Sequence, residues 1–289
     1  MSTAVSTARI DITPTSANQC MAGYGGTGPR LNTSTYSPLT ARCVVIWDNG
    51  NPNAIVSADV LGWPRSMHQA IRQQVLALTT WTTADFALLS THTHNGPVLL
   101  EMPDPTITYN LTDTTGVAAY SSWLQARIVS LVQTALAAPR TPCTLDYQVA
   151  SQTWSSNREG LSYRETAVPV LVARGTDGLP VATLFSYGCH PVAAGEQTGW
   201  DGDYPAAACE VIEAAVPNSF ALYIPGPAGD QDPEGARGWA LRNKLGAQLG
   251  AAVVSAASAP GRSVTSSIMT SYQEVALPLD VTNTPANLA

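Results

Sequence analysis

The sequence has little charge of either sign, and basic residues are the scarcer kind. Charged side chains make up 12% of its 289 residues, about half of the roughly 25% that is usual in soluble domains. The net charge is −7, and Lys244 is the only lysine. Nucleic-acid binding needs a basic stripe or patch, so this class of function is excluded. The surface is either rich in Ser, Thr and Asn or covered by other subunits, and the sequence leaves both open.

Long apolar runs, paired cysteines and linkers are also missing. No run approaches the roughly 18 apolar residues of a membrane-spanning helix, so no transmembrane segment is expected. Residues Met1 to Ile10 lack the basic start and apolar core of a signal peptide, which predicts a cytoplasmic protein and leaves secretion open. The five cysteines have no spacing typical of a disulfide framework or a structural zinc site. Without a linker, we expect one domain over residues 1–280 and a polar tail over residues 281–289.

Short apolar strands alternate with amphipathic helices along the chain. Strand pairs with a turn signal between them predict two hairpins, at residues 42–47 with 54–59 and at 168–173 with 181–187. Further strands are expected at 86–90, 220–224 and 269–279, and helices behind Pro64 and over 117–138, 204–215 and 235–257. Residues 98–115 are predicted to form a long surface loop. This mixture predicts an α/β fold with a mixed central sheet flanked by helices.

The chain has only four histidines, and three of them follow predicted strands. His92 and His94 are two positions apart, so in an extended segment both face the same side. His190 joins them only if its strand is the neighbour of theirs in the sheet. Imidazole is a common zinc ligand, and the three together predict a metal site. His68 lies within a predicted helix, and a structural role is expected for it.

Carboxylates occupy similar positions at the ends of elements. Asp59 ends a strand, Asp203 precedes a helix, and Asp230 and Asp232 follow a glycine turn. Singly, each is typical of a helix cap or a turn acceptor. Together with the histidines, they are candidates for metal ligands, for partners that orient the ligands, or for a general base. The residues alone leave these roles open.

Eight short motifs occur in one order along nearly the whole chain. They are Ile12-Thr13-Pro14, Met21-Ala22-Gly23-Tyr24-Gly25, Ser57-Ala58-Asp59-Val60-Leu61-Gly62, Ser90-Thr91-His92-Thr93-His94-Asn95-Gly96-Pro97, Asn157-Arg158, Gly188-Cys189-His190-Pro191-Val192, Asp203-Tyr204-Pro205 and Gly226-Pro227-Ala228-Gly229-Asp230-Gln231-Asp232-Pro233. The ordered set resembles the neutral/alkaline non-lysosomal ceramidase family. Active members cleave the amide of ceramide, so the resemblance implies the N-terminal α/β domain of such an enzyme. It implies that His92 and His190 bind zinc, and that His94 and Arg158 help hold the reacting water or carbonyl.

Two departures from the family pattern bear on activity. Asp232 stands where the family has a catalytic serine, and a carboxylate there is a candidate base rather than a replacement for the hydroxyl. The resemblance also implies a glutamate and a tyrosine ligand well beyond the strand expected at 269–279, and the sequence ends at Ala289. We therefore expect an incomplete zinc site, with Asp59 and Asp203 as further candidate ligands.

Three functions remain at this stage. The first is a zinc-dependent hydrolase acting on a lipid-like N-acyl amide or ester. The second is an inactive protein of the same fold that forms a homo-oligomer or filament, because an uncovered strand at 269–279 is a template for pairing with another chain. The third is a small-molecule binding protein that uses the same pocket, and fold alone does not separate the three.

Overall fold

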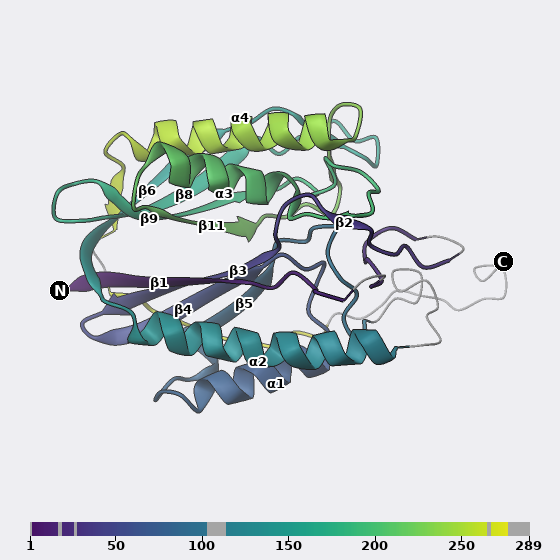
Figure 1. The fold of residues 1–289 in the computed structure, drawn as a ribbon. Helices are drawn as coiled ribbons and strands as arrows, with labels where there is room; N and C mark the ends of the chain where they lie inside the picture. Colours follow the sequence, from purple (N-terminus) through teal and green to yellow (C-terminus); the bar gives the residue numbers. More distant parts are fainter. Residues whose placement is uncertain (1, 17–18, 26–27, 103–113, 265–266, 277–289) are drawn as a thin grey trace.

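Most helices and strands of the computed structural model lie close to their predicted positions (Figure 1). The structure describes residues 2–16, 19–25, 28–102, 114–264 and 267–276. The predicted strands and helices are present as β3 (Thr40–Asp48), β4 (Asn51–Ala58), α1 (Arg65–Leu76), β5 (Phe86–Ser90), α2 (Thr115–Ala137), β8 (Ala167–Arg174), β9 (Pro180–Tyr187), α3 (Asp203–Ala215), β11 (Phe220–Pro225) and α4 (Trp239–Ala257). Both predicted hairpins are confirmed, since β3 pairs with β4 and β8 with β9 in antiparallel register.

The strands form one mixed sheet in the order β11-β9-β8-β6-β1-β3-β4-β5. The pairs β9–β11 and β4–β5 are parallel, and the other neighbours are antiparallel. A short strand, β13 (Arg262–Val264), pairs with β6. The predicted α/β fold with a mixed central sheet and flanking helices is therefore confirmed.

Two strands that the sequence analysis does not predict join the halves of this sheet. They are β1 (Thr3–Asp11) and β6 (Thr141–Ser151), which pair over only three residues, Thr3 to Val5 against Thr141 to Cys143. Both strands carry polar side chains at many positions, buried as well as exposed, so their apolar alternation is too weak to mark them as strands. The short junction lets the sheet turn back on itself.

Folding of the sheet produces four layers, with a helix layer outside each half (Figure 1). Helices α1 and α2 pack on β1, β3, β4 and β5, while α3 and α4 pack on the half that contains β8, β9 and β11. A third apolar core lies between the two halves and includes Val44, Ile46, Leu184 and Leu222. Neighbours on β3 face opposite ways, since Cys43 and Val45 contact the helix side. Strands with two buried faces explain the nearly continuous apolar runs of the sequence.

The predicted C-terminal strand is wrong over residues 269–276, which have no regular secondary structure. This segment is held by side chains instead: Asp48 Oδ2 accepts from the Ile268 amide at 2.9 Å, and Thr270 donates to Asp85 at 2.7 Å. Met269 is 92% exposed. Local alternation favours a strand, but no partner strand lies beside the segment in the part of the chain that the structure describes. The self-assembly hypothesis relied on such a strand and gains no support here.

Two short ribbons and a 3-10 turn complete the description, and the ribbons pair loops rather than extend the sheet. The ribbon β2 (Ser34–Thr35) with β10 (Gly199–Trp200) is parallel, and β7 (Ser155–Asn157) with β12 (Gln231–Pro233) is antiparallel. A 3-10 turn spans Thr83–Asp85. The tail at 281–289 and residues 103–113 of the predicted loop lie outside the described residues. Among the described helices, none has the length and apolar character needed to cross a membrane.

Candidate metal centre

Three of the four histidines meet at the end of the molecule where the loops after β5 and β9 come together. His92 and His94 follow β5, and His190 follows β9. The sequence analysis expected His190 to join the other two histidines only if its strand lay beside theirs in the sheet. The strands β5 and β9 are not neighbours, so this expectation is wrong. Instead, the folded sheet brings β11, the partner of β9, against β5. His190 therefore reaches the other two through packing between layers.

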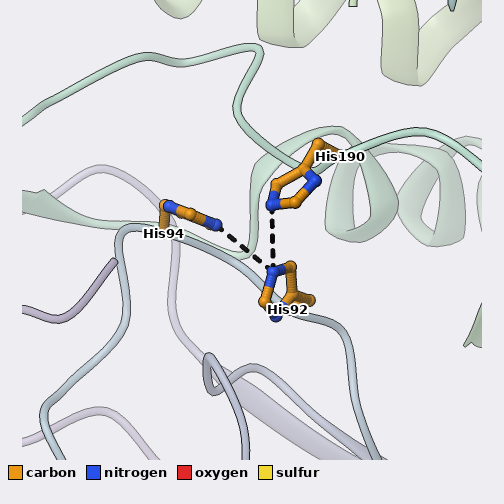
Figure 2. Close-up of side chains that lie close together, drawn as sticks. All are labelled: His92, His94 and His190. Atoms are coloured by element: carbon orange, nitrogen blue, oxygen red, sulfur yellow. Dashed lines mark hydrogen bonds between the residues drawn. The ribbon is translucent and has the colours of Figure 1, made fainter. Parts of the chain in front are cut away.

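The imidazole rings of this three-histidine group (His92, His94 and His190) point toward one another (Figure 2). The Nε2 atoms of His92 and His190 are 3.0 Å apart, and those of His94 and His92 are 3.4 Å apart. One nitrogen from each ring lies within 4.8 Å of the others. The three rings are arranged around a common point.

Backbone carbonyls fix the tautomers of two of these rings. Nδ1 of His92 lies 2.6 Å from the Leu61 carbonyl, and Nδ1 of His190 lies 2.8 Å from the Ala228 carbonyl. A carbonyl only accepts, so each Nδ1 carries the proton and each Nε2 presents a lone pair toward the other ring. A hydrogen bond of this kind behind the ligand is usual for histidines that bind metal.

The donor set fits a bound cation. Two Nε2 lone pairs that face each other at 3.0 Å repel unless a positive charge lies between them. Zinc with bonds of about 2.0–2.1 Å in tetrahedral geometry places its nitrogen ligands roughly 3.3 Å apart, which is close to the observed separations. The three-histidine group can therefore hold a metal ion.

His92 has an unusual backbone conformation, with a φ angle of 66°. Sequence reasoning expected an extended segment, and the structure corrects this. Its amide donates to the Val60 carbonyl at 3.1 Å, which holds the chain in the left-handed region. A residue without glycine's freedom is strained there, and such strain is common at functional sites.

Burial keeps the histidines of the group neutral. It is the largest cause that lowers the pKa of His92, His94 and His190. The pKa of His94 falls to about 2, because the rings of His92 and His190 add to the effect of burial. Neutral imidazole is the form that binds metal.

Asp232 lies on β12 and Arg158 directly follows β7, so both belong to the short ribbon region beside His190. The His190 amide donates to the Gln231 carbonyl at 2.7 Å, which ties the ribbon to the histidine loop. Arg158 Nη1 is 3.9 Å from Asp232 Oδ1, and the Arg158 charge contributes to the lowered pKa of both His92 and His190. Two predicted catalytic residues are therefore near the three-histidine group.

Asp232 also forms an ion pair that sequence reasoning missed, with Arg237 at 2.5 Å from Nη2 to Oδ2. Its other oxygen, Oδ1, is buried and has no hydrogen-bond partner among the described residues. The ion pair fixes the carboxylate, while Oδ1 has only the long contact to Arg158 and can still accept a hydrogen bond. Arg237 lies between Ala236 and Gly238 and belongs to no motif, so no local signal marks it.

Asp59 and Asp203, the other predicted ligands, are not part of the three-histidine group. Asp59 accepts hydrogen bonds from the Thr40 amide at 2.7 Å and from the Thr91 hydroxyl at 3.1 Å. Asp203 accepts from the amides of Ala193 and Ala194 at 3.0 and 2.9 Å. Burial raises the pKa of both, that of Asp203 to about 6. Their carboxylates hold together the loops around the site, and a ligand role stays a prediction without geometric support.

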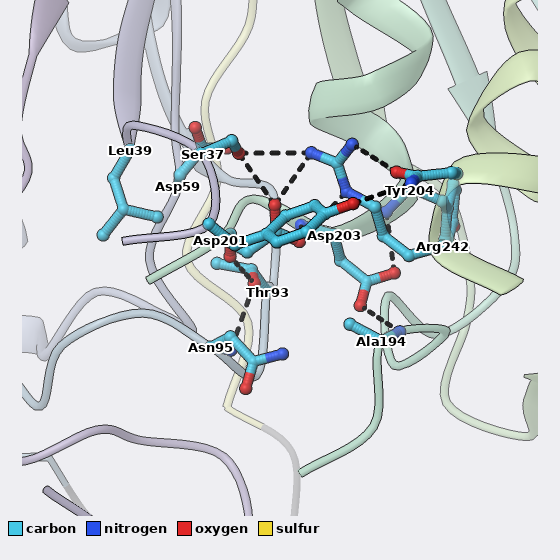
Figure 3. Close-up of polar contacts among 12 residues, drawn as sticks. Ser37, Leu39, Asp59, Thr93, Asn95, Ala194, Asp201, Asp203, Tyr204 and Arg242 are labelled. Carbon is cyan, nitrogen blue, oxygen red and sulfur yellow. Dashed lines mark hydrogen bonds and ion pairs between the residues drawn. The ribbon is translucent and has the colours of Figure 1, made fainter. Parts of the chain in front are cut away.

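A fully buried ion pair supports the loop that carries His92 and His94 (Figure 3). Arg242 on α4 donates to Asp201 with an Nη2–Oδ1 distance of 2.8 Å. The Asp201 carbonyl accepts from Thr93 Oγ1 at 2.6 Å, and the Asp201 amide donates to the Asn95 carbonyl at 3.2 Å. This network connects α4 to the residues on either side of His94. The sequence gives no sign of it, because Asp201 and Arg242 are far apart in the chain.

Residues near the N-terminus pack directly against His94. The ring of Tyr24 meets that of His94 edge-on at 5.1 Å between centroids. A Cβ atom on Gly23 would lie 2.7 Å from the His94 side chain. The resemblance of residues 21–25 to a family motif was the only signal for this contact. His68 lies elsewhere, on α1 beside Arg72.

A cavity of about 210 Å³ opens beside the three-histidine group. Its lining combines His92 and His190 with the glycine turn that includes Gly226 and Gly229. A larger cavity of about 270 Å³ is lined by Thr13 to Ser16, Gln19 and residues of α2 that include Trp123. No cluster of titratable side chains lines that second cavity, so the smaller cavity is the better candidate for a catalytic site.

Comparison with solved structures finds the same fold in ceramidases. The chain is similar to the crystal structure of neutral ceramidase from Pseudomonas aeruginosa, with a TM-score of 0.79 and 18% identity over 92% of this chain. It is also similar to a structure of a ceramidase complexed with C2, with a TM-score of 0.80 and 18% identity over 92% of this chain. This chain spans about half the length of these proteins, 46% and 45% respectively. No family model and no curated protein sequence matches it.

Proposed function

We propose that the protein is a zinc-dependent hydrolase that cleaves a lipid-like N-acyl amide or ester. The observation that carries this proposal is the convergence of three neutral imidazoles, two with their tautomers fixed by carbonyls, beside a cavity. Neutral imidazoles are the usual protein donors of catalytic zinc sites. The shared fold with ceramidases supports the choice of an acyl bond as the target.

Each site residue has a role in this proposal. His92 and His190 bind the metal through Nε2, because their Nδ1 protons are already committed to Leu61 and Ala228. Zinc bound there supplies Lewis acidity, which polarises a carbonyl and acidifies water. His94 faces the same point and orients the reacting water or carbonyl.

Arg158 and Asp232 act from the ribbon at the side of the site. The Arg158 side chain is 43% exposed and its ion pair with Asp232 is long, at 3.9 Å, so its guanidinium can also donate hydrogen bonds to the oxygen on which negative charge develops. Asp232 Oδ1 has no hydrogen-bond partner among the described residues and accepts a proton from water. Arg237 holds the carboxylate in place.

The cavity restricts the substrate. Its volume of about 210 Å³ lies below the roughly 300–1,000 Å³ of sites that enclose a whole drug-sized ligand. It therefore holds the reacting acyl group, and the rest of a lipid-like substrate extends beyond it. Short and medium acyl chains are the first substrates to assay.

Metal content and hydrolysis, measured on one preparation, test the proposal. The wild-type chain is expected to bind close to one zinc per chain by mass spectrometry, and both His92→Ala and His190→Ala are expected to lose it. His68→Ala is the matched control and should keep the metal. Release of fatty acid from a panel of N-acyl amides and esters should disappear with a chelator and return with zinc. Unchanged zinc in the double variant of His92 and His190 would refute the site.

A further inference from the structure

Arg30 is a buried cation without an anionic partner. It is 7% exposed, and it makes no ion pair among the described residues. The other buried arginines differ, since Arg42 pairs with Glu213 and Arg242 pairs with Asp201. Burying an unpaired charge is costly, so fold stability alone does not account for Arg30.

The guanidinium of Arg30 instead binds neutral acceptors around His94. Nη1 donates to Asn95 Oδ1 and to the Gln197 carbonyl, both at 2.6 Å. Nη2 donates to the Ala22 carbonyl at 2.6 Å and to the carbonyl of His94 itself. Four hydrogen bonds from one planar group thus connect the segments of Ala22 and Gln197 to the peptide of His94 and Asn95.

Arg30 also touches the residue that packs on that ring. Its guanidinium lies 5.0 Å from the centre of the Tyr24 ring, and Tyr24 in turn meets the His94 ring edge-on. Gly23 also packs against His94, so closely that there is no room for a Cβ between them. Unlike the Nδ1 atoms of His92 and His190, that of His94 makes no close hydrogen bond among the described residues, and the Gly23 backbone is its polar neighbour. Packing and the fixed backbone therefore have to set its direction.

We propose that Arg30 is a positioning residue that sets the orientation of the His94 imidazole within the three-histidine group. The planar fork of arginine makes four directed hydrogen bonds at once, which the single ammonium of lysine does not reproduce. Its effect on turnover rests on the proposed hydrolase function. Its effect on the orientation of the His94 ring does not rest on that function, and this effect can be measured without metal or substrate.

Imidazole NMR on the metal-free protein tests the positioning directly. The chain has four histidines, so a protein labelled with ¹⁵N in histidine gives a simple spectrum of ring signals. Each signal is assigned with the variant that lacks the corresponding histidine. Arg30→Ala and Arg30→Lys are expected to shift the ring signals of His94, while those of His68 stay in place. Arg127→Ala, on α2 away from the site, is the control and should leave all four unchanged. Unchanged His94 signals in both Arg30 variants would overturn the proposal.

Kinetics and rescue separate positioning from a loss of folding. Arg30→Ala is expected to lower kcat roughly 10–100-fold, the usual effect of losing a group that orients a metal-site residue. KM should change less, because Arg30 does not line the cavity beside His92 and His190.

Millimolar guanidinium should restore both the His94 signals and part of kcat in Arg30→Ala. Restored signals without any hydrolysis, even in wild type, would refute the proposed function and leave the role of Arg30 intact. Failure of guanidinium to restore the signals in folded Arg30→Ala would count against positioning.

Discussion

The Nε2 atoms of His92 and His190 lie 3.0 Å apart, although 98 positions separate the two residues in the chain. Their strands, β5 and β9, belong to different halves of one folded sheet. The candidate metal centre therefore depends on the packing of the two halves, and on the buried contacts that hold the connecting loops.

His94 is expected to differ from the other two histidines when substituted. His94→Gln should keep zinc, because His92 and His190 retain their carbonyl-fixed tautomers, but should lower kcat by at least about 100-fold, within the range of a lost acid–base or orienting group. Zinc content and kcat on the same sample check this. Loss of zinc equal to that in His92→Ala would instead make His94 a third ligand.

The metal-free protein should become less stable as the pH falls below about 6.5, the ordinary histidine value. The pKa values of His92, His94 and His190 are lowered in the folded chain, so between the folded and unfolded values the unfolded chain binds more protons. Stability is therefore full above pH 6.5 and is lost on acidification, by at most about 1.4 kcal/mol per pH unit for each histidine. Urea unfolding with a chelator, from pH 8 to 5, measures it. Replacing all three with Gln should flatten the curve, and an equally steep curve would contradict this account.

The buried pair of Asp201 and Arg242 should matter far more than an exposed pair. Asp201→Asn leaves Arg242 buried without a counter-charge, and breaking a buried pair in this way costs about 3–5 kcal/mol. Glu274→Gln removes the partner of Arg65, whose side chain is 72% exposed, and should leave the unfolding midpoint nearly unchanged. Chemical denaturation of both variants checks the contrast, and equal effects would refute it.

Gly23→Ala is expected to affect both stability and the site. The φ angle of Gly23 is 110°, and an added Cβ would lie 2.7 Å from His94. The backbone strain alone costs about 1–3 kcal/mol, and the His94 ring has to move. Gly28→Ala is the matched control, since a Cβ there meets nothing within 4 Å. Thermal unfolding and the imidazole spectrum test this, and a variant that behaves like Gly28→Ala would show that the contact is unimportant.

The sequence by itself determined the local elements and the residue types at their ends. Strands such as β5 and helices such as α2 were predictable because an apolar face repeats with the period of the element. The positions of His92, His94 and His190 after strands followed from the same reading. The order of short motifs also indicated the fold, which the ceramidase structures share.

Only the tertiary structure decided which of these residues meet. Strands β1 and β6 were missed because their polar faces hide the alternation, and the fold of the sheet depends on their short pairing. The strand expected at 269–279 is absent over residues 269–276, because a strand needs a partner that local sequence does not specify. Asp59 and Asp203 were placed correctly at element ends, yet backbone amides and hydroxyls occupy their oxygens. Arg30 carries no local signal at all, since its role comes from acceptors supplied by segments far apart in the chain.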